Sequence, residues 1–327
     1  MTFGGGEGMW TAIADVDQQG ATSLVKAALD AGVNFIDTAN VYSNGLSEQM
    51  TGRALADLGV KRSDVIVATK ALGPMGEGVN DRGASRAHLL HQIDASLERL
   101  GLDHVDLYQI HGWDPATPVE ETLRALEWIV ASGRARYVGV SNWAAWQIMK
   151  ALGLSERLGL ERFVSLQAYY SLAGRDIERE IAPLLQSEGL GLMVWSPLAG
   201  GFLSGKYTRD GEANGRRASF DFPPVDTDKA YGVIDVMREI AQARGCTVAQ
   251  VALAWLLAKP SVSTVIVGAK RLDQLSDNLG AAEVRLSPED IERLDSASAL
   301  APEYPGWMIE RQAVYRQGGL AGEPPKS

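Results

Sequence analysis

Short apolar runs typical of β-strands alternate with segments of helical periodicity along nearly the whole chain. The strand-like runs recur seven times, at residues 33–38, 65–70, 105–111, 136–141, 163–169, 191–196 and 263–267. Between them, apolar residues repeat at spacings of three and four, as at Leu89, Ile93, Leu97 and Leu100. That spacing gives a helix one apolar stripe to lay on a sheet. The repeated βα units therefore predict an α/β fold with a parallel sheet covered by helices.

Two α/β architectures fit this alternation, a closed (β/α)8 barrel and an open doubly wound sheet. An open dinucleotide-binding sheet normally shows G-x-G-x-x-G between a strand and a helix, and no glycine cluster of this chain has that setting. Polar residues at several separate strand ends also suit a barrel, where all strand ends meet at one mouth. We therefore expect a (β/α)8 TIM barrel. Only MTFGGG is available for its first strand, so that strand is short or the chain is abbreviated.

The length favours a single domain over residues 1–327, because barrel enzymes often exceed the usual domain size without splitting. Two segments interrupt the regular alternation. Residues 199–230 are rich in Gly, Arg, Asp and Pro, and we expect a long loop at the mouth of the kind that often forms a lid. Residues 301–327 are expected to form a partly ordered C-terminal flap with a disordered end.

The charge and the cysteine content exclude several classes of function. A formal net charge of −10 and a pI near 5.0 argue against a nucleic-acid surface, so small molecules are the expected partners. Cys246 is the only cysteine, which excludes a disulfide within the chain and a cysteine-based metal cluster. There is no basic leader before an apolar run and no stretch of roughly 20 apolar residues. We therefore expect a cytoplasmic protein with no membrane segment, and the oligomeric state stays open.

Four polar side chains fall at or just after the ends of predicted strands, and they are Asp37, Tyr42, Lys70 and His111. A tyrosine is a poor acid near neutral pH, because its unperturbed pKa is about 10, but a nearby ammonium stabilises the phenolate. The four residues therefore indicate a proton-delivery site for the reduction of a carbonyl. The alternative for Asp37 and Lys70 is a structural ion pair that ties two strands together.

Several motifs, in order, make the chain similar to the aldo-keto reductase family over nearly its whole length. They are FIDTANVYSNGLSEQMTGRAL, VATK, LYQIHGWD, YVGVSN, SLQAYYS, VWSPLAGGFLSGKY and VGAKRLDQLSDN. The resemblance implies a barrel that reduces an aldehyde or ketone to an alcohol by hydride transfer, without a metal. It implies that Tyr42 is the general acid and that Lys70, held by Asp37, favours its phenolate. His111 would donate a hydrogen bond to the carbonyl oxygen.

The resemblance also implies a nicotinamide dinucleotide site. Ser141, Asn142 and Gln167 would bond to the carboxamide, whose donor and acceptor groups suit amide side chains. Tyr170 rather than its neighbour Tyr169 would stack on the nicotinamide ring, unless both are core aromatics. The pyrophosphate would lie under a loop that contains Ser196, Leu198, Gly200 and Lys206. The adenosine end is assigned to Gly268, Lys270, Arg271, Gln274 and Asn278.

Two of these motifs leave a choice. Gly200 to Lys206 also obeys the G-x-x-x-x-G-K pattern of nucleotide hydrolases, but Tyr207 replaces the Ser or Thr that would hold magnesium. We therefore reject the hydrolase interpretation. Lys270 and Arg271 supply donors for a 2′-phosphate, which favours NADPH. Gln274 stands where other members of the family have a basic residue, so NADH use stays possible.

The sequence gives little information about the substrate. Trp113 and Trp143, with Phe3 and Trp10 as further candidates, predict an aromatic wall for an uncharged carbonyl compound. Two rival functions remain. One is a redox-sensing subunit that binds the cofactor with little turnover, as the channel-associated members of the family are thought to do. The other is a degenerate barrel that binds nucleotide but has lost turnover.

Overall fold

The computed structural model describes residues 1–209, 217 and 220–317. Within them lies one parallel sheet of seven strands, which follow one another in chain order and are each hydrogen-bonded to the next. The strands are β1 (Phe35–Asp37), β2 (Ile66–Ala71), β3 (Val105–Ile110), β4 (Ala135–Ser141), β5 (Ser165–Tyr169), β6 (Gly191–Trp195) and β7 (Val262–Val265). They coincide with the seven apolar runs of the sequence, so the predicted parallel α/β arrangement is confirmed.

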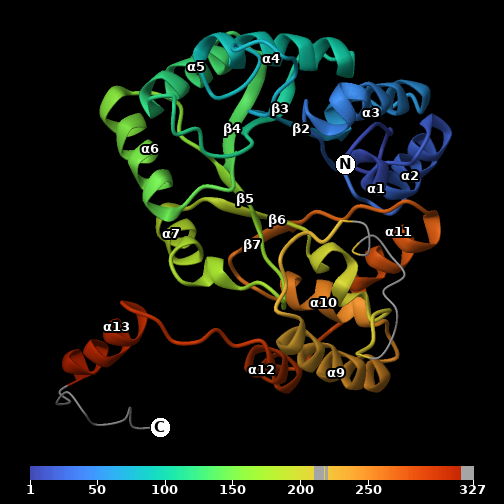
Figure 1. Cartoon of the computed structure of the whole chain (residues 1–327), viewed down its shortest axis with the longest axis vertical. Coiled ribbons are helices and arrows are strands. Elements are labelled where there is room, and N and C mark those ends of the chain that lie inside the picture. The colour runs from blue at the N-terminus through green and yellow to red at the C-terminus, as the bar shows by residue number, and fades with distance from the viewer. Residues whose placement is uncertain (210–216, 218–219, 318–327) are drawn as a thin grey trace.

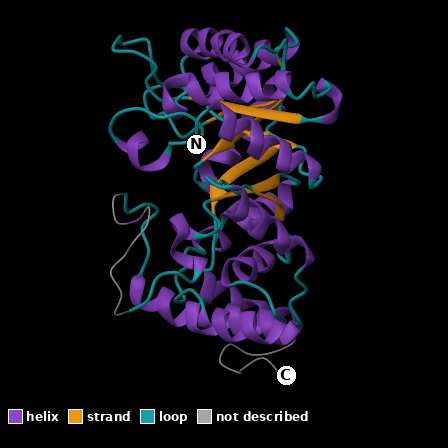
Figure 2. Cartoon of the chain, turned by 90° about the vertical axis from the view of Figure 1, so that its right-hand side faces the viewer, coloured by secondary structure: helices purple, strands orange, loops and turns teal. Residues whose placement is uncertain are grey.

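Helices connect the strands and cover the outer face of the sheet (Figures 1 and 2). In chain order the described helices, of which α1 and α2 precede β1 and α11 to α13 follow β7, are α1 (Met9–Ile13), α2 (Gln18–Asp30), α3 (Leu46–Asp57), α4 (Arg86–Leu100), α5 (Val119–Ala131), α6 (Ala145–Leu158), α7 (Ile181–Glu188), α9 (Thr227–Arg244), α10 (Val248–Leu257), α11 (Leu272–Leu279), α12 (Pro288–Ala297) and α13 (Gly306–Ala313). Short 3₁₀ turns are η1 (Tyr42–Gly45), η2 (Arg62–Asp64), η3 (Asp176–Glu178), η4 (Ala199–Ser204), η5 (Gly280–Glu283) and η6 (Val314–Gln317).

The helix ends follow from local sequence, and α4 shows how. The Ser85 side chain accepts a hydrogen bond from the backbone N–H of His88, which caps the first turn. Gly101 adopts the left-handed conformation at φ 64°, where a residue with a side chain is disfavoured, and ends the helix. Leu89 and Ile93 of the predicted stripe are fully buried against the sheet. The apolar stripe that the spacing predicted is thus the face of α4 that packs against the sheet.

The sheet curls until its two edge strands share one interior cluster. Phe35 of β1 and Ile266, just after β7, pack with buried Ala68, Leu107 and Met193. This curled parallel sheet with its outer helices confirms the predicted barrel class. In the described part of the chain, however, the sheet ends at β1 and β7, which are not paired with each other.

The N-terminal segment was expected to supply the first strand, and it does so only as an isolated contact. Phe3 forms a single parallel bridge with Val16, and the backbone N–H of Gly4 donates to the carbonyl of Val16 at 2.9 Å. The described residues therefore contain seven strands, and the expected eighth strand is not among them.

The two predicted interruptions are described in part. From 199–230, the structure includes η4 and the start of α9, whereas residues 210–216 and 218–219 lie outside the described residues. From 301–327, it includes α13 and η6, which stand away from the barrel in Figure 1, and residues 318–327 lie outside. Among the described helices, none taken singly has the length and apolar character to cross a membrane, although the sharply bent pair α9 and α10 meets that criterion together.

Candidate active site

The four residues predicted to carry the chemistry lie together at the carboxyl edge of the sheet. Asp37 ends β1, Tyr42 begins η1, Lys70 lies in β2 and His111 follows β3. The Nζ atom of Lys70 lies 2.6 Å from Oδ2 of Asp37 and 3.4 Å from the phenol oxygen of Tyr42. The rings of Tyr42 and His111 meet edge-on, with centroids 5.6 Å apart. The predicted constellation is therefore one group of contacting side chains.

The loop after β1 fixes the position of the phenol by an unusual backbone path. The N–H of Asn40 donates to the carbonyl of Lys70 at 3.0 Å, so the chain continues beside β2 after the strand has ended. Ser43 and Asn44 then adopt positive φ angles of 49° and 52°. Residues with side chains rarely adopt such angles, so the surrounding contacts must hold this strained turn next to Tyr42.

Lys70 keeps its charge although it is completely buried. Its side chain is 0% exposed, and that of Asp37 is 7% exposed. Burial lowers the pKa of the ammonium, but the Asp37 carboxylate and the Tyr42 phenol raise it, and the net shift is upward. The carbonyl of Thr38 accepts a further hydrogen bond from Nζ at 2.8 Å. A permanent positive charge therefore lies beside the phenol.

The phenol of Tyr42 remains a protonated donor at neutral pH. Burial raises the pKa of this phenol, the Lys70 ammonium lowers it, and the Asp37 carboxylate raises it again, so that the pKa lies above its usual 10.0. The sequence predicted the lowering influence of the ammonium, and that influence is present. Burial outweighs it, because a phenolate loses more hydration there than the cation replaces.

His111 is neutral over the ordinary pH range. Burial, and next the positive charge of Lys70, lower the pKa of its imidazole to about 3. A neutral imidazole still carries one N–H, which can donate a hydrogen bond without a change of charge. The backbone carbonyl of His111 accepts from Nδ2 of Asn142 at 3.1 Å, which ties the end of β3 to the end of β4.

The residues assigned to the nicotinamide reach the same edge from β4 and β5, and they are Ser141, Asn142 and Gln167. The Oγ atom of Ser141 is buried and has no hydrogen-bond partner among the described residues. Asn142 adopts a φ of 60°, and its Oδ1 accepts from Nε1 of Trp195 at 3.0 Å. An unpaired buried hydroxyl next to a fixed amide is what a carboxamide group would fit.

A second glutamine, Gln109 of β3, completes the surroundings of Asp37 and was not predicted. Its Nε2 lies 3.3 Å from Oδ1 of Asp37, and the same oxygen accepts from Nε2 of Gln167 at 2.9 Å. Gln109 is fully buried, and its Oε1 has no partner among the described residues. The signal in the sequence was a polar residue inside an apolar run, two positions before His111 and so on the same face.

The prediction that Tyr170 stacks on the nicotinamide is wrong, because this side chain points away from the mouth. Tyr170 is 2% exposed, its ring packs on Trp255 of α10 and its hydroxyl donates to Glu178. Successive side chains of a strand alternate between faces. Gln167 faces the interior of the curl, so Tyr169 shares that face and Tyr170 does not.

Trp195, at the end of β6, is an aromatic residue of the mouth that sequence reasoning missed. Its ring is half-buried and lies 5.2 Å from that of Tyr169 and 5.6 Å from that of Phe222, centroid to centroid. The ring of Phe222 is nearly parallel to it, at 7°. The available signal was an aromatic residue directly before Ser196 at the end of a predicted strand.

Of the two tryptophans assigned to the substrate, only Trp113 is accessible. Trp143 is 3% exposed, and its ring lies behind Trp113 at 4.8 Å and against Phe163 at 5.6 Å. The prediction that Trp143 lines the pocket is therefore wrong, and this residue supports Trp113 from the core. Trp10 of α1, which is 8% exposed, packs edge-on against the ring of Tyr42, with centroids 6.0 Å apart.

The residues assigned to the pyrophosphate gather around one tight turn after β6. Oγ of Ser196 accepts from the N–H of Gly200 at 2.9 Å, and Leu198 lies within the same turn. Gly200 has a φ of 67°, and a Cβ there would approach a backbone carbonyl to 2.4 Å, so only glycine fits. The ammonium of Lys206 lies 3.7 Å from the place of a Cβ on Gly201. A glycine turn with an adjacent cation suits a diphosphate.

The residues assigned to the adenosine end lie before and along α11: Gly268, Lys270 and Arg271 precede the helix, Gln274 lies in its first turn, and Asn278 lies near its end. The ammonium of Lys270 pairs with Asp15 at 3.0 Å, and the guanidinium of Arg271 pairs with Asp273 at 2.9 Å. These surface pairs are weak. A 2′-phosphate would therefore have to compete with two carboxylates for its cations.

A curled parallel sheet that carries a buried ammonium, a phenol, a carboxylate and an imidazole at its carboxyl edge defines an α/β-barrel enzyme. Comparison with known proteins gives the family. The model of the Aldo/keto reductase family matches residues 1–299. The chain therefore belongs to the aldo/keto reductase family of (β/α)8-barrel oxidoreductases.

The relatives of this chain carry two kinds of name. A probable voltage-gated potassium channel subunit beta of Oryza sativa subsp. japonica is 39% identical over 305 residues, which cover 90% of this chain and 93% of the relative. The versiconal hemiacetal acetate reductase of Aspergillus parasiticus is 35% identical over 89% of this chain and 90% of the relative. A putative aryl-alcohol dehydrogenase of Schizosaccharomyces pombe is 32% identical over 88% and 87%.

Proposed function

We propose that this protein is an NADPH-dependent carbonyl reductase that acts in the cytoplasm on a small, uncharged aldehyde or ketone. The observation that carries the proposal is the Lys70 ammonium, held 2.6 Å from Asp37 and 3.4 Å from the Tyr42 phenol at the mouth of the barrel. The dehydrogenase and reductase names of two relatives support this reaction class.

The cofactor, when bound, supplies the hydride for the carbonyl carbon. Tyr42 transfers its phenol proton to the carbonyl oxygen, and the Lys70 ammonium stabilises the phenolate that remains. His111, as a neutral donor, holds the same oxygen and shares its developing negative charge. Trp10 and Trp113 exclude water from one side of the substrate.

The test is a spectrophotometric assay that follows oxidation of NADPH and NADH against a panel of aldehydes and ketones. The panel includes aromatic and aliphatic members of both classes, because the aromatic wall favours flat apolar substrates. Turnover of at least one carbonyl compound with NADPH is expected. Tight NADPH binding with no turnover of any member would reject the reductase.

The rival function is a cofactor-binding regulatory or redox-sensing subunit with little turnover. The relatives named as potassium channel beta subunits favour it. Such a subunit would keep the same four residues, so their presence does not separate the two functions. The rate in the carbonyl assay does.

The pH profile of reduction follows from the two perturbed pKa values. The active form has Tyr42 protonated, and since the pKa of this phenol is raised, kcat/KM should be level from about pH 5 to pH 9 and fall only above that range. Because the pKa of His111 is lowered to about 3, no break is expected near the usual imidazole pKa of about 6.5. A profile that bends near pH 6.5 and loses the bend in His111→Gln would contradict the neutral imidazole.

Gln109→Leu should lower kcat about tenfold, since a hydrogen bond to a carboxylate contributes about 1.5 kcal/mol. The dissociation constant for NADPH should stay the same, because the side-chain hydrogen bond of Gln109 within the described residues goes to Asp37. Gln167→Leu is the matched control, in which both kcat and cofactor affinity should fall. Stopped-flow kinetics and fluorescence titration measure the two quantities. Full-rate turnover by Gln109→Leu would show that Gln167 alone suffices for Asp37.

The preference for NADPH rests on Lys270 and Arg271, so their joint replacement by alanine is informative. KM for NADPH should rise about tenfold, because charge-assisted contacts to a 2′-phosphate are lost, whereas KM for NADH should change less than about twofold. Lys26→Ala, which removes an exposed cation on α2, is the control. An equal change in both KM values would show that Lys270 and Arg271 do not determine the preference for NADPH over NADH.

A further inference from the structure

The C-terminal helix α13 exposes an apolar surface that the other described residues do not cover. No residue of α13 is buried, and Figure 1 shows the helix standing away from the barrel. Tyr304, Trp307, Ile309 and Tyr315, on and beside it, are 73%, 43%, 61% and 51% exposed. Exposed groups of large apolar side chains on a soluble protein usually mark an interaction surface.

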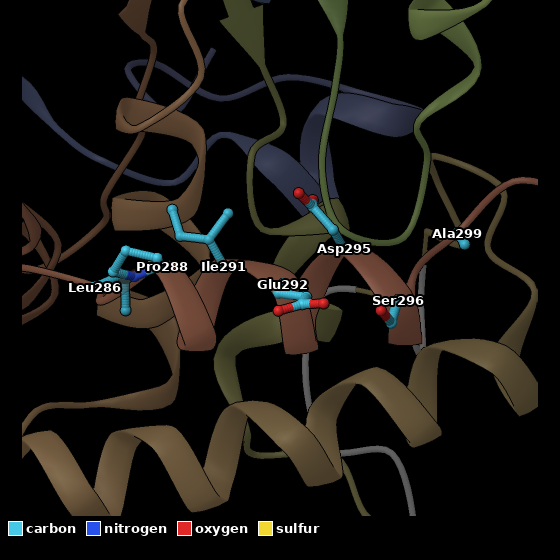
Figure 3. A pocket seen from close by; sticks show the side chains of 7 residues that line it. All are labelled: Leu286, Pro288, Ile291, Glu292, Asp295, Ser296 and Ala299. Carbon is cyan, nitrogen blue, oxygen red and sulfur yellow. The ribbon is translucent and has the colours of Figure 1, made fainter. Parts of the chain in front are cut away.

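A groove along α12 offers a second apolar surface (Figure 3). It has a volume of about 670 Å³, and Leu286, Pro288, Ile291 and Ala299 supply its apolar lining. Two acidic residues also line it. The carboxylate of Asp295 is already held by the Lys259 ammonium at 2.7 Å and by Nε1 of Trp255. Glu292 is therefore the exposed carboxylate of the groove.

The segment between the two helices is held by contacts with Lys229 and Arg179. The Lys229 ammonium donates to the carbonyl of Ala299 at 2.6 Å. Arg179 donates to the carbonyl of Ala301 at 3.2 Å and pairs with Glu303 at 3.0 Å. Only two residues then remain before α13 begins, and they span at most about 10 Å. With these contacts in place, α13 stands apart from α12 of its own chain (Figure 1).

We infer that α13 docks in the α12 groove of a second copy of this chain, and that the two copies exchange their C-terminal helices. The exchange is self-complementary, as a twofold dimer requires, and it buries the exposed side chains at both ends. The charges also match. Arg311 follows Trp307 by four residues and so lies on the same helical face, where it can meet Glu292 of the groove.

Sedimentation velocity of the full chain at micromolar concentration tests this directly. The wild type should be a dimer, and Trp307→Ser and Ile291→Arg should each raise the dimer dissociation constant by about tenfold or more, because each removes an apolar anchor from one side of the interface. Trp128→Ser, which changes a tryptophan on α5 that is 50% exposed, should leave the dimer intact. Circular dichroism melts confirm that the variants remain folded.

Charge reversal makes the test specific for the exchanged pair. Glu292→Arg and Arg311→Glu should each weaken the dimer, and the double variant should regain most of the lost affinity, because the pair is restored with opposite signs. A monomeric wild type would overturn the inference. So would a dimer that withstands Ile291→Arg, since α13 would then be docked elsewhere, or a double variant no tighter than the single ones.

Discussion

Tyr42→Phe is expected to lower kcat/KM for carbonyl reduction about 10³-fold, within the range of 10²–10⁴ typical for loss of a general acid. The variant removes one oxygen atom, the one that lies 3.4 Å from the Lys70 ammonium. Its ring should keep its place, because the edge-on contacts with Trp10 and His111 involve the aromatic carbon atoms. Steady-state kinetics on the best substrate of the panel measure the loss.

The control for Tyr42→Phe is the affinity for the cofactor. Fluorescence titration with NADPH should give a dissociation constant within about twofold of the wild type, because an interaction made only in the transition state is missing. If the variant reduces carbonyls as fast as the wild type, the phenol is not the acid. If it loses cofactor binding as well, the residue shapes the pocket instead.

Lys70→Met is expected to damage both turnover and stability. It removes the cation that stabilises the phenolate, so kcat should fall about 10²-fold or more. It also leaves the Asp37 carboxylate unpaired in a setting where its side chain is only 7% exposed. Removal of one partner of a buried ion pair costs about 3–5 kcal/mol, which urea unfolding would register as a lower midpoint.

The double variant Asp37→Asn, Lys70→Met separates the two effects. It leaves no buried unpaired charge, so most of the stability should return, whereas turnover should stay low because the ammonium is still absent. A structural ion pair predicts the opposite, with activity that returns together with stability. The double variant therefore decides between the two interpretations of this pair.

The sequence predicted the fold because the strands of a parallel barrel are buried and carry continuous apolar runs, and all seven described strands were found in this way. It predicted Asp37, Tyr42, Lys70 and His111 as one site because strand ends converge at one edge.

What the sequence did not predict depends on which way a side chain faces. Tyr169 and Tyr170 are adjacent, and only the inward direction of Gln167 shows which of them reaches the mouth. Trp143 was misplaced for a similar reason, since a tryptophan near a mouth can line it or support another from behind. The direction of the net pKa shift of Tyr42 was not predicted either, because burial and a neighbouring cation act on this pKa in opposite directions.

The Lys70–Asp37 pair has a second consequence through the strand on which Asp37 lies. β1 has only three residues, none of them fully buried, and among the described strands it is bonded on one side only, to β2. Local opening begins where buried contacts are few. The ion pair with the Lys70 ammonium therefore also holds β1, the strand most prone to local opening, in place. Warming that releases β1 should therefore abolish catalysis while the rest of the barrel is still folded.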